Sequence, residues 1–296
     1  MFTTSPVWQS YLFDDGTMDA VWFDVDGDGD LDLFLACSAT TDSKDSNANM
    51  VYLNRPEIWG DQRFGQLPDW RANDELWTTT AKAADIDKDG DMDIIAANGF
   101  NNCNKVVMYE NTGDSLDPDY TWSVDVYWPY GCDLGDVNQD GWLDVGISSY
   151  YSSSALVINK NGTLGSTLVW NSSDEVDSYR CAFGDMNGDG YPEFAVANWN
   201  TSDGRGNNTV YLNEIPRPAV MIDEPENGDV VSGVVTVRGR ASYSEGSVDT
   251  VLLKLNLWTK WYKVNGTENW VYKWDTTSVE NGNYTLTAIA KAGEAY

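Results

Sequence analysis

The sequence predicts an all-β fold, with a propeller-type repeat domain of four blade-like repeats followed by a small β-sandwich. Two observations lead to this prediction. One aspartate-rich segment occurs four times between residues 24 and 193, and short apolar segments separated by Gly, Asn and Asp turns follow it, without helical periodicity. The chain has 296 residues, 42% of them hydrophobic and 13% aromatic, which is enough for two packed domains.

The recurring segment has the form Asp-x-Asp/Asn-x-Asp-Gly-x-x-Asp/Glu, and its copies begin at Asp24, Asp85, Asp136 and Asp185. An apolar run follows each copy directly. A Trp lies 14 to 16 residues before each copy, at Trp8, Trp70, Trp122 and Trp170. A later strand-like segment ends in Asn, at Asn54, Asn111, Asn159 and Asn213. Four shared features in four copies indicate an internal repeat.

A period of about 50 residues with about four short strands is typical of the blades of a β-propeller. Each blade must stack on its neighbours to bury its faces, so we expect residues 1–215 to supply four blades. Three arrangements stay open: a small four-bladed ring, a partial propeller from a longer protein, or part of a ring assembled from several chains.

The repeat domain is expected to end near residue 215, because Pro216 and Pro218 favour an extended connector. The charge changes at the same place. Residues 1–216 hold 37 acidic and 10 basic residues, net −27, whereas residues 217–296 hold 10 acidic and 8 basic residues, net −2. Strand-like alternation across residues 216–296 predicts a second β domain. This domain is short of one closing strand, so we expect it to be truncated at its C-terminus or completed from elsewhere.

The composition excludes several classes of function. A formal net charge of −29 repels nucleic acid and anionic membranes, so neither is an expected partner. The absence of histidine excludes a His base, a Ser-His-Asp or Cys-His nucleophile and His-ligated zinc or haem. No apolar run approaches the length of a membrane span, and residues 1–11 lack the basic and apolar regions of a secretory signal.

The aspartate loops predict calcium sites. Side chains at positions 1, 3 and 5 can converge on one point, Gly at position 6 permits the sharp turn, position 7 offers its carbonyl, and a carboxylate at position 9 closes an all-oxygen cage that suits Ca²⁺. An EF-hand would need Glu at position 12, which is Leu35, Ala96, Ile147 and Val196 here. We expect about four Ca²⁺, one per loop. The expected ligands are Asp24, Asp26, Asp28, Asp30 and Asp32 in loop 1; Asp85, Asp87, Asp89, Asp91 and Asp93 in loop 2; Asp136, Asn138, Asp140, Trp142 and Asp144 in loop 3; and Asp185, Asn187, Asp189, Tyr191 and Glu193 in loop 4.

Asp, Asn and Gly also form ordinary turns, which is the competing interpretation of these loops. Carboxylates about 4 Å apart, however, repel by about 4 kcal/mol per pair at an effective dielectric constant near 20. A cation would remove this repulsion. Because Asn138 and Asn187 replace Asp at position 3, we expect loops 3 and 4 to bind Ca²⁺ more weakly than loops 1 and 2.

The repeats resemble the FG-GAP/VCBS repeats of the integrin α-subunit propeller and of many bacterial and archaeal surface proteins. The resemblance rests on the Asp loop, on the apolar strand after it and on the Gly before it at Gly135 and Gly184; repeats 1 and 2 have Phe23 and Ala84 there. Residues 217–296 resemble a bacterial-type Ig-like domain. The resemblance implies loops that hold Ca²⁺ and rigidify the blades, and a role in adhesion or ligand binding.

We therefore expect a non-catalytic, extracellular or cell-surface calcium-binding module whose partner is a protein or glycan ligand. Calcium sites in extracellular modules often bind at about 10⁻⁴ to 10⁻³ M, which would leave them empty in cytosol. Two alternatives stay open. One is a polysaccharide-active hydrolase or lyase that uses a carboxylate pair. Acids outside the loops could supply the pair, although no motif singles any of them out; examples are Asp74, Glu75, Asp174, Glu175 and Asp177. The other is a structural spacer of a larger surface protein.

Two further sets of residues have open interpretations. Tyr127, Trp128, Tyr130, Tyr150 and Tyr151 could form a sugar-stacking platform, although packing within and between blades is the favoured interpretation. The cysteines permit two disulfides, and the candidate pairs are Cys132 with Cys181 and Cys37 with Cys103. Buried free thiols are the alternative.

Overall fold

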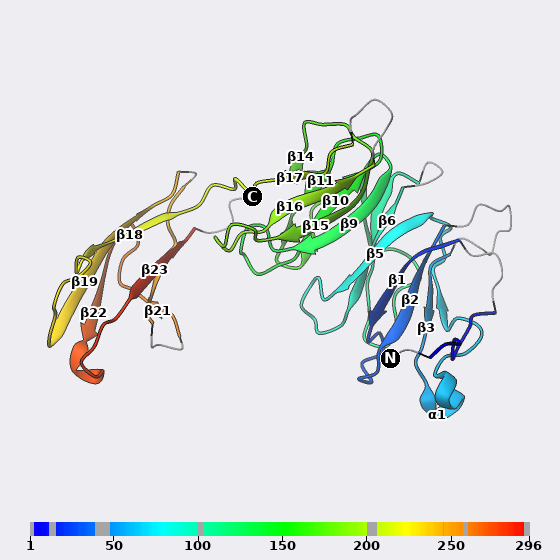
Figure 1. Cartoon of the computed structure of the whole chain (residues 1–296), viewed down its shortest axis with the longest axis horizontal. Coiled ribbons are helices and arrows are strands. Elements are labelled where there is room, and N and C mark those ends of the chain that lie inside the picture. Colours follow the sequence, from blue (N-terminus) through cyan, green and yellow to red (C-terminus); the bar gives the residue numbers. More distant parts are fainter. Residues whose placement is uncertain are drawn as a thin grey trace. The chain divides into compact units, whose positions relative to one another are not determined.

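The computed structural model describes residues 3–11, 16–38, 48–99, 103–199, 206–244, 246–256 and 260–292. The chain divides into two compact units, Met1–Asn213 (unit 1) and Glu214–Tyr296 (unit 2), and each is considered by itself. Strands dominate the regular structure of both units (Figure 1), which confirms the all-β prediction. No helix in the described part of the chain is long and apolar enough to cross a bilayer.

The described residues of unit 1 form four antiparallel sheets of three or four strands, paired in chain order, and one two-stranded hairpin. Sheet 1 contains β1 (Thr17–Phe23), β2 (Asp32–Cys37), β3 (Met50–Tyr52) and β4 (Trp70–Arg71); sheet 2 contains β5 (Thr78–Ala84), β6 (Asp93–Asn98), β7 (Lys105–Tyr109) and β8 (Trp122–Asp125). Sheet 3 contains β9 (Pro129–Gly135), β10 (Asp144–Ser149), β11 (Ala155–Val157) and β14 (Trp170–Asn171); sheet 4 contains β15 (Ser178–Gly184), β16 (Glu193–Asn198) and β17 (Thr209–Tyr211). The hairpin β12 (Asn159–Lys160) and β13 (Thr163–Leu164) and the short helices α1 (Pro56–Trp59) and η1 (Gly60–Gln62) lie in connections.

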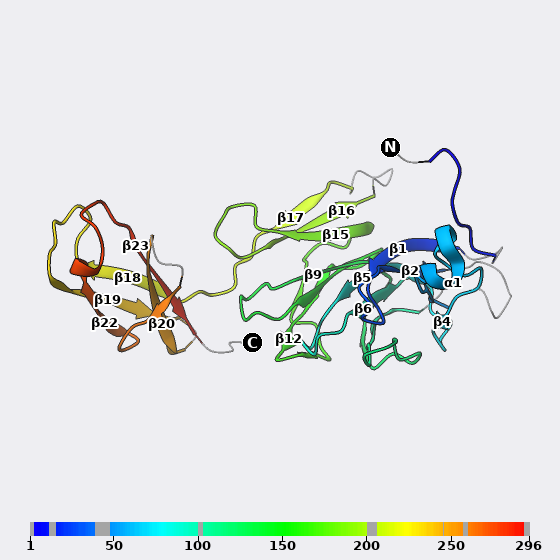
Figure 2. The same cartoon turned by 90° about the horizontal axis from the view of Figure 1, so that it is seen from below.

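The apolar core of unit 1 lies between consecutive sheets. The first strands are neighbours, β1 beside β5, β5 beside β9 and β9 beside β15, as Figure 2 also shows. In the buried strand β6, Ile94 and Ala96 join the core shared with sheet 1, whereas Ile95 and Ala97 join the core shared with sheet 3. A strand covered on both faces needs apolar residues at every position, which explains the unbroken apolar run after each Asp loop.

The sequence repeat is offset from the sheets by one strand. Trp70, Trp122 and Trp170 begin β4, β8 and β14, each the last strand of its sheet, whereas Trp8 lies outside the strands in the described residues. Trp70 and Trp122 donate their indole N–H to the carbonyls of Leu116 and Gly165, which lie between strands of the next sheet, and Trp8 donates to the carbonyl of Gly65 before β4. The prediction of about four strands per blade is therefore correct for sheets 1 to 3, while the described part of sheet 4 has three.

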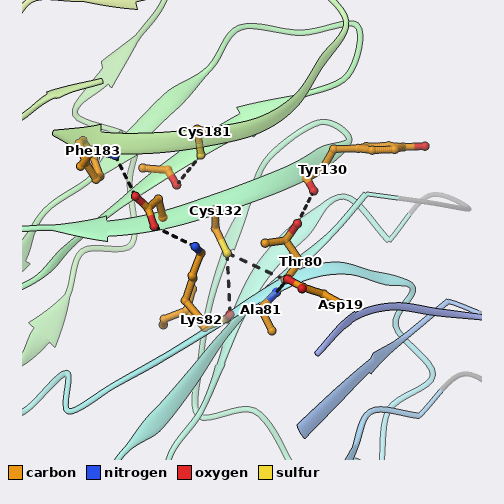
Figure 3. Close-up of polar contacts among 11 residues, drawn as sticks. Asp19, Thr80, Ala81, Lys82, Tyr130, Cys132, Cys181 and Phe183 are labelled. Carbon is orange, nitrogen blue, oxygen red and sulfur yellow. Dashed lines mark hydrogen bonds and ion pairs between the residues drawn. The ribbon is translucent and has the colours of Figure 1, made fainter. Parts of the chain in front are cut away.

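Carboxylates connect the first strands of neighbouring sheets (Figure 3). Asp19 Oδ2 accepts a hydrogen bond from Ala81 N at 3.1 Å. Asp133 Oδ2 accepts one from Phe183 N at 2.8 Å, and Asp133 Oδ1 lies 3.1 Å from Lys82 Nζ. Asp19 therefore links sheet 1 to sheet 2. Asp133 of sheet 3 links its sheet to sheet 2 through Lys82 and to sheet 4 through Phe183.

The four cysteines, all within the described residues, form no disulfide, so the suggested pairs are wrong. The alternative of buried thiols is correct for Cys37 and Cys132, whereas Cys103 and Cys181 are partly exposed. Cys132 Sγ points to the carbonyls of Thr80 and Ile95 in sheet 2, and Cys181 Sγ points to the carbonyl of Gly146 in sheet 3. Each thiol therefore faces the sheet before its own (Figure 3), because equivalent positions in a repeat point in equivalent directions. Burial raises the pKa of the Cys181 thiol to about 12.

Unit 2 is a small sandwich of two antiparallel sheets, as predicted. In the described residues, one sheet contains β18 (Ala219–Glu224), β19 (Val234–Ser242) and β22 (Asn269–Asp275); the other contains β20 (Thr250–Leu255), β21 (Tyr262–Lys263) and β23 (Leu286–Lys291), and η2 (Thr276–Ser278) follows β22. Val251, Leu253 and Leu255 alternate along β20 and join Trp270 and Trp274 of β22 in one buried core. This alternation is expected of a strand with one buried face.

Candidate metal centres

The four Asp loops occupy the same place in each sheet, between the first and second strands. Residues 24–32, 85–93, 136–144 and 185–193 link β1 to β2, β5 to β6, β9 to β10 and β15 to β16. The Gly at position 6 has φ between 90° and 108° in all four loops, as the predicted sharp turn requires. Position 4 is also left-handed, at Gly27, Lys88, Gln139 and Gly188, which the sequence does not indicate because two of these residues are not glycine.

Loops 1 and 2 each bring three carboxylates together. Oxygens of Asp24, Asp26 and Asp28 lie within 4.8 Å of one another, and so do those of Asp85, Asp87 and Asp89. These are positions 1, 3 and 5 of the loops. Both groups could therefore hold a metal ion with oxygen ligands.

Several oxygens in these loops are buried without a hydrogen-bond partner. At position 1, one carboxylate oxygen accepts from the position-6 Gly N–H in every loop, at 2.8 to 3.2 Å. The other oxygen, Oδ1 of Asp24, Asp85 and Asp136, has no partner in the described part of the chain, and neither does Asp26 Oδ1. Burying a polar atom without a partner is costly, and a cation would remove that cost. An all-oxygen donor set of this kind fits a hard divalent cation such as Ca²⁺.

Loops 3 and 4 are arranged differently at position 3. Asn138 Nδ2 donates to Asp140 Oδ2 at 3.1 Å, and Asn187 Nδ2 donates to Glu193 Oε1 at 3.2 Å. An amide N–H therefore satisfies a carboxylate that a cation would otherwise satisfy. This agrees with weaker binding in loops 3 and 4, which stays a prediction.

The carboxylates at position 9 have a structural task that sequence analysis missed. Asp32, Asp93 and Asp144 are at most 1% exposed. One oxygen of each accepts from the N–H at loop position 2, and the other accepts from the N–H of Asn54, Asn111 or Asn159, at 2.8 to 3.0 Å. Burial raises the pKa of Asp32 and Asp93 to about 6 and that of Asp144 to about 7.

Position 9 thus joins loops 1 to 3 to the chain just after the third strand of the sheet, and the recurrent Asn two residues after that strand was the available signal. These carboxylates are not part of the two gathered groups. Glu193 of loop 4 makes the bond to the position-2 N–H, of Met186, at 2.9 Å. A carboxylate oxygen has two lone pairs, so it can accept a hydrogen bond and bind an ion at the same time. A ligand role at position 9 therefore stays a prediction.

Position 7 bonds within its own loop, and position 4 of loops 2 and 3 contacts the next loop. The N–H groups at position 7, of Asp30, Asp91, Trp142 and Tyr191, donate to the position-5 carboxylate of their own loop at 2.8 to 3.0 Å. Lys88 Nζ of loop 2 lies 4.0 Å from the ring centre of Trp142 in loop 3, and Gln139 Nε2 of loop 3 donates to the Gly190 carbonyl in loop 4 at 2.7 Å. Position 7 as a carbonyl ligand stays a prediction.

Comparison with known families matches both units. The FG-GAP-like repeat model matches residues 24–96, 85–147 and 136–196, and the bacterial Ig domain model matches residues 218–288. A comparison with curated proteins gives no match. The crystal structure of the V. cholerae biofilm matrix protein Bap1 aligns with 98% of this chain at 13% identity and a TM-score of 0.38, and this chain spans 65% of the length of that one. Because the repeat matches extend over residues 24–196, more than half of the sequence, the chain belongs to the FG-GAP-like repeat family and carries a bacterial Ig domain after the repeats.

Proposed function

We propose that this protein is a non-catalytic, calcium-stabilised binding module that acts outside the cell or at its surface and attaches to a protein or glycan ligand. The gathered carboxylates of loops 1 and 2, with buried oxygens that have no hydrogen-bond partner, are the main support. Ca²⁺ fits better than Mg²⁺, because Ca²⁺ accepts irregular cages of protein oxygens whereas Mg²⁺ keeps several waters.

In this proposal the ion neutralises charge and fixes the loop. Positions 1, 3 and 5 would hold it, while the position-9 carboxylate keeps the loop joined to the chain just after the third strand. Four Ca²⁺ would add eight positive charges to residues 1–216, whose net charge is −27, so most of the acidic surface would stay solvated. Membership of the FG-GAP-like repeat family supports a surface role.

Two of the five acids considered for catalysis, Asp74 and Asp174, have contacts that favour a structural role. Asp74 Oδ2 accepts a hydrogen bond from Tyr109 Oη at 2.8 Å, and Asp174 Oδ1 accepts one from Tyr211 Oη. Both Asp residues lie 11 positions before their Asp loops, and both Tyr residues end a third strand. The same contact in sheets 2 and 4 supports a packing feature of the repeat over a single catalytic pair.

Calcium titration of the full chain tests the proposal. We expect isothermal titration calorimetry after chelation to find about four Ca²⁺. At 2 mM Ca²⁺, a site with a Kd of about 10⁻⁴ M contributes about 1.8 kcal/mol. Loops 1 and 2 together should then raise the Tm of unit 1 by about 10 °C over its value in EGTA.

The double variant Asp28→Ala/Asp89→Ala should lose two ions, because it removes position 5 from the two gathered groups. Asp61→Ala/Asp125→Ala removes the same charge from exposed positions outside the loops and should keep all the sites. No bound Ca²⁺, or equal binding by both double variants, would refute the calcium sites. Release of reducing ends from a polysaccharide would refute the non-catalytic part.

A further inference from the structure

Six aromatic residues gather at the end of sheets 3 and 4 that is opposite the Asp loops. We define this aromatic cluster as Tyr127, Trp128, Tyr150, Tyr151, Tyr179 and Trp199. They come from the connection before β9, the residues after β10, the start of β15 and the residue after β16. Loops 3 and 4 follow the other ends of β9 and β15, and a seven-residue strand spans about 23 Å. The cluster is therefore separate from the candidate metal centres.

The rings form one continuous row. Tyr127 stacks on Trp128 and Trp128 stacks on Tyr150, both with ring centres 5.8 Å apart. Tyr150 contacts Tyr179 at 5.5 Å, and Tyr179 contacts Trp199 at 5.6 Å. Tyr151 adjoins the row, with its ring centre 4.1 Å from that of Tyr150. The buried Tyr130 lies 5.2 Å from both Tyr150 and Tyr179 and supports the row from within the sheet.

The outer members of the row are exposed to solvent. The relative exposures of Tyr127, Tyr151 and Trp199 are 55%, 56% and 61%. Rings that served only to fill the space between sheets would be covered by those sheets. A contiguous exposed aromatic surface marks an interaction site more often than a single exposed ring does.

The other repeats indicate that packing does not require these rings. Tyr150 and Trp199 directly follow the second strand of their sheets, and the equivalent residues of sheets 1 and 2 are Ser38 and Gly99. Tyr179 is the second residue of its first strand, where sheets 1 and 2 have Met18 and Thr79. Sheets 1 and 2 form the same antiparallel strands without aromatic rings at these positions. The packing interpretation favoured by the sequence therefore does not account for the cluster.

The backbone holds two of the rings in an unusual conformation. Trp128 and Tyr151 have φ angles of 47° and 59°, in the left-handed region that bulky residues rarely adopt. Trp128 N donates to Asn104 Oδ1 at 3.1 Å, and the Trp128 carbonyl accepts from Tyr150 N at 2.8 Å. Such strain persists where surrounding contacts enforce it, and it concentrates at functional sites.

We propose that the aromatic cluster binds the pyranose rings of a neutral polysaccharide. This inference rests on the proposed function, because it names the ligand class of that binding module. The apolar C–H face of a pyranose ring can lie on an exposed aromatic face, and tyrosine hydroxyls can donate to and accept from sugar hydroxyls. The net charge of −27 on residues 1–216 opposes polymers of uronic acids or sulfated sugars.

Affinity electrophoresis and calorimetry of the Ca²⁺-saturated full chain test this proposal, with xyloglucan, laminarin and galactomannan as neutral probes and alginate as an anionic one. We expect at least one neutral probe to bind and alginate not to bind. Tyr127→Ala, Tyr151→Ala and Trp199→Ala should each weaken binding about tenfold. Tyr127→Phe keeps the ring and should bind within about threefold of the unchanged protein.

Trp22→Ala is the matched control, because Trp22 is 56% exposed on β1 and lies outside the cluster; it should leave binding unchanged. The proposal is overturned if no neutral probe binds, if alginate alone binds, or if the three Ala variants bind as tightly as Trp22→Ala. Calcium content and Tm are measured on the same samples. Loss of glycan binding with intact Ca²⁺ binding would remove only the ligand class, and the reverse result would remove only the calcium sites.

Discussion

At the scale of single residues, each Asp loop contains two kinds of carboxylate. Those at positions 1, 3 and 5, where loops 3 and 4 have Asn at position 3, are partly or fully exposed, and in loops 1 and 2 their oxygens gather. The carboxylate at position 9 is buried, and in loops 1 to 3 both of its oxygens accept backbone N–H groups. Position 9 should therefore stabilise the fold without any metal. The described hydrogen bonds of positions 1 and 5 lie within their own exposed loops, so positions 1, 3 and 5 should contribute mainly when an ion is bound.

Asp144→Ala should lower the free energy of unfolding of unit 1 by about 3 kcal/mol in EGTA, because it leaves the N–H groups of Val137 and Asn159 buried and unpaired. Asp140→Ala, at exposed position 5 of the same loop, should change it by less than about 1 kcal/mol. Urea unfolding of both variants in EGTA measures this difference. Equal losses would mean that position 9 has no special structural role.

At the scale of strands and loops, the Asn two residues after the third strand connects sheets 2, 3 and 4 to the preceding sheet. Asn111 Nδ2 donates to the carbonyls of Val25, in the loop of the preceding sheet, and Met92, in its own loop. Asn159 and Asn213 make the equivalent bonds to Ile86 and Val137 of the preceding loops. For Asn54, in sheet 1, the described contact of Nδ2 is with Leu31 in its own loop.

Asn111→Ala should therefore cost about 2 kcal/mol of unfolding free energy, since the side chain is 2% exposed and bonds to two loops. Asn54→Ala removes the equivalent side chain where the described bond is exposed and local, and it should cost no more than about 1 kcal/mol. Chemical unfolding at saturating Ca²⁺ compares the two variants. A cost for Asn54→Ala as large as that for Asn111→Ala would argue against the inter-sheet role.

Features written in one short stretch of sequence could be predicted, and features that depend on several stretches could not. The Asp loops, the apolar second strands and the recurrent Asn are local patterns repeated four times, so the all-β repeat fold follows from them. The bonds from position 9 to the N–H of Asn54, Asn111 and Asn159 join residues 15 to 22 apart, so the recurrent Asn shows that the position is special without showing its partner. The aromatic cluster gathers residues from three connections and from β15. Only two of its parts, Tyr127 with Trp128 and Tyr150 with Tyr151, are recognisable as local sequence patterns.

The cysteine prediction failed for a related reason. Equal positions in consecutive repeats suggested that Cys132 and Cys181 face each other. Equivalent side chains in successive repeats have the same orientation relative to their own sheet. Both thiols therefore point towards the preceding sheet. Equivalence in a repeat predicts a shared environment, but it does not predict mutual contact.

At the scale of the whole molecule, the two units differ in charge. Residues 1–216 have net charge −27 and residues 217–296 have net charge −2. The described ion pairs of this part include Arg55 with Asp69 at 2.7 Å and Lys82 with Asp133 at 3.1 Å. Ten basic residues are too few to pair with most of the 37 acidic ones. Like charges at this density destabilise a compact state, and dissolved salt weakens that repulsion.

We therefore expect the two units to respond differently to ions. In EGTA, raising NaCl from 0.01 to 0.15 M shortens the screening length from about 30 to about 8 Å, which should raise the Tm of unit 1 and leave that of unit 2 nearly unchanged. Calorimetry of the full chain records both transitions, and Asp144→Ala identifies the transition of unit 1. Calcium should raise that transition well beyond NaCl of equal ionic strength, because bound ions satisfy particular carboxylate oxygens whereas diffuse ions only screen them. Equal effects of the two salts would mean that Ca²⁺ acts by screening alone, and the four loops would then be turns without metal sites.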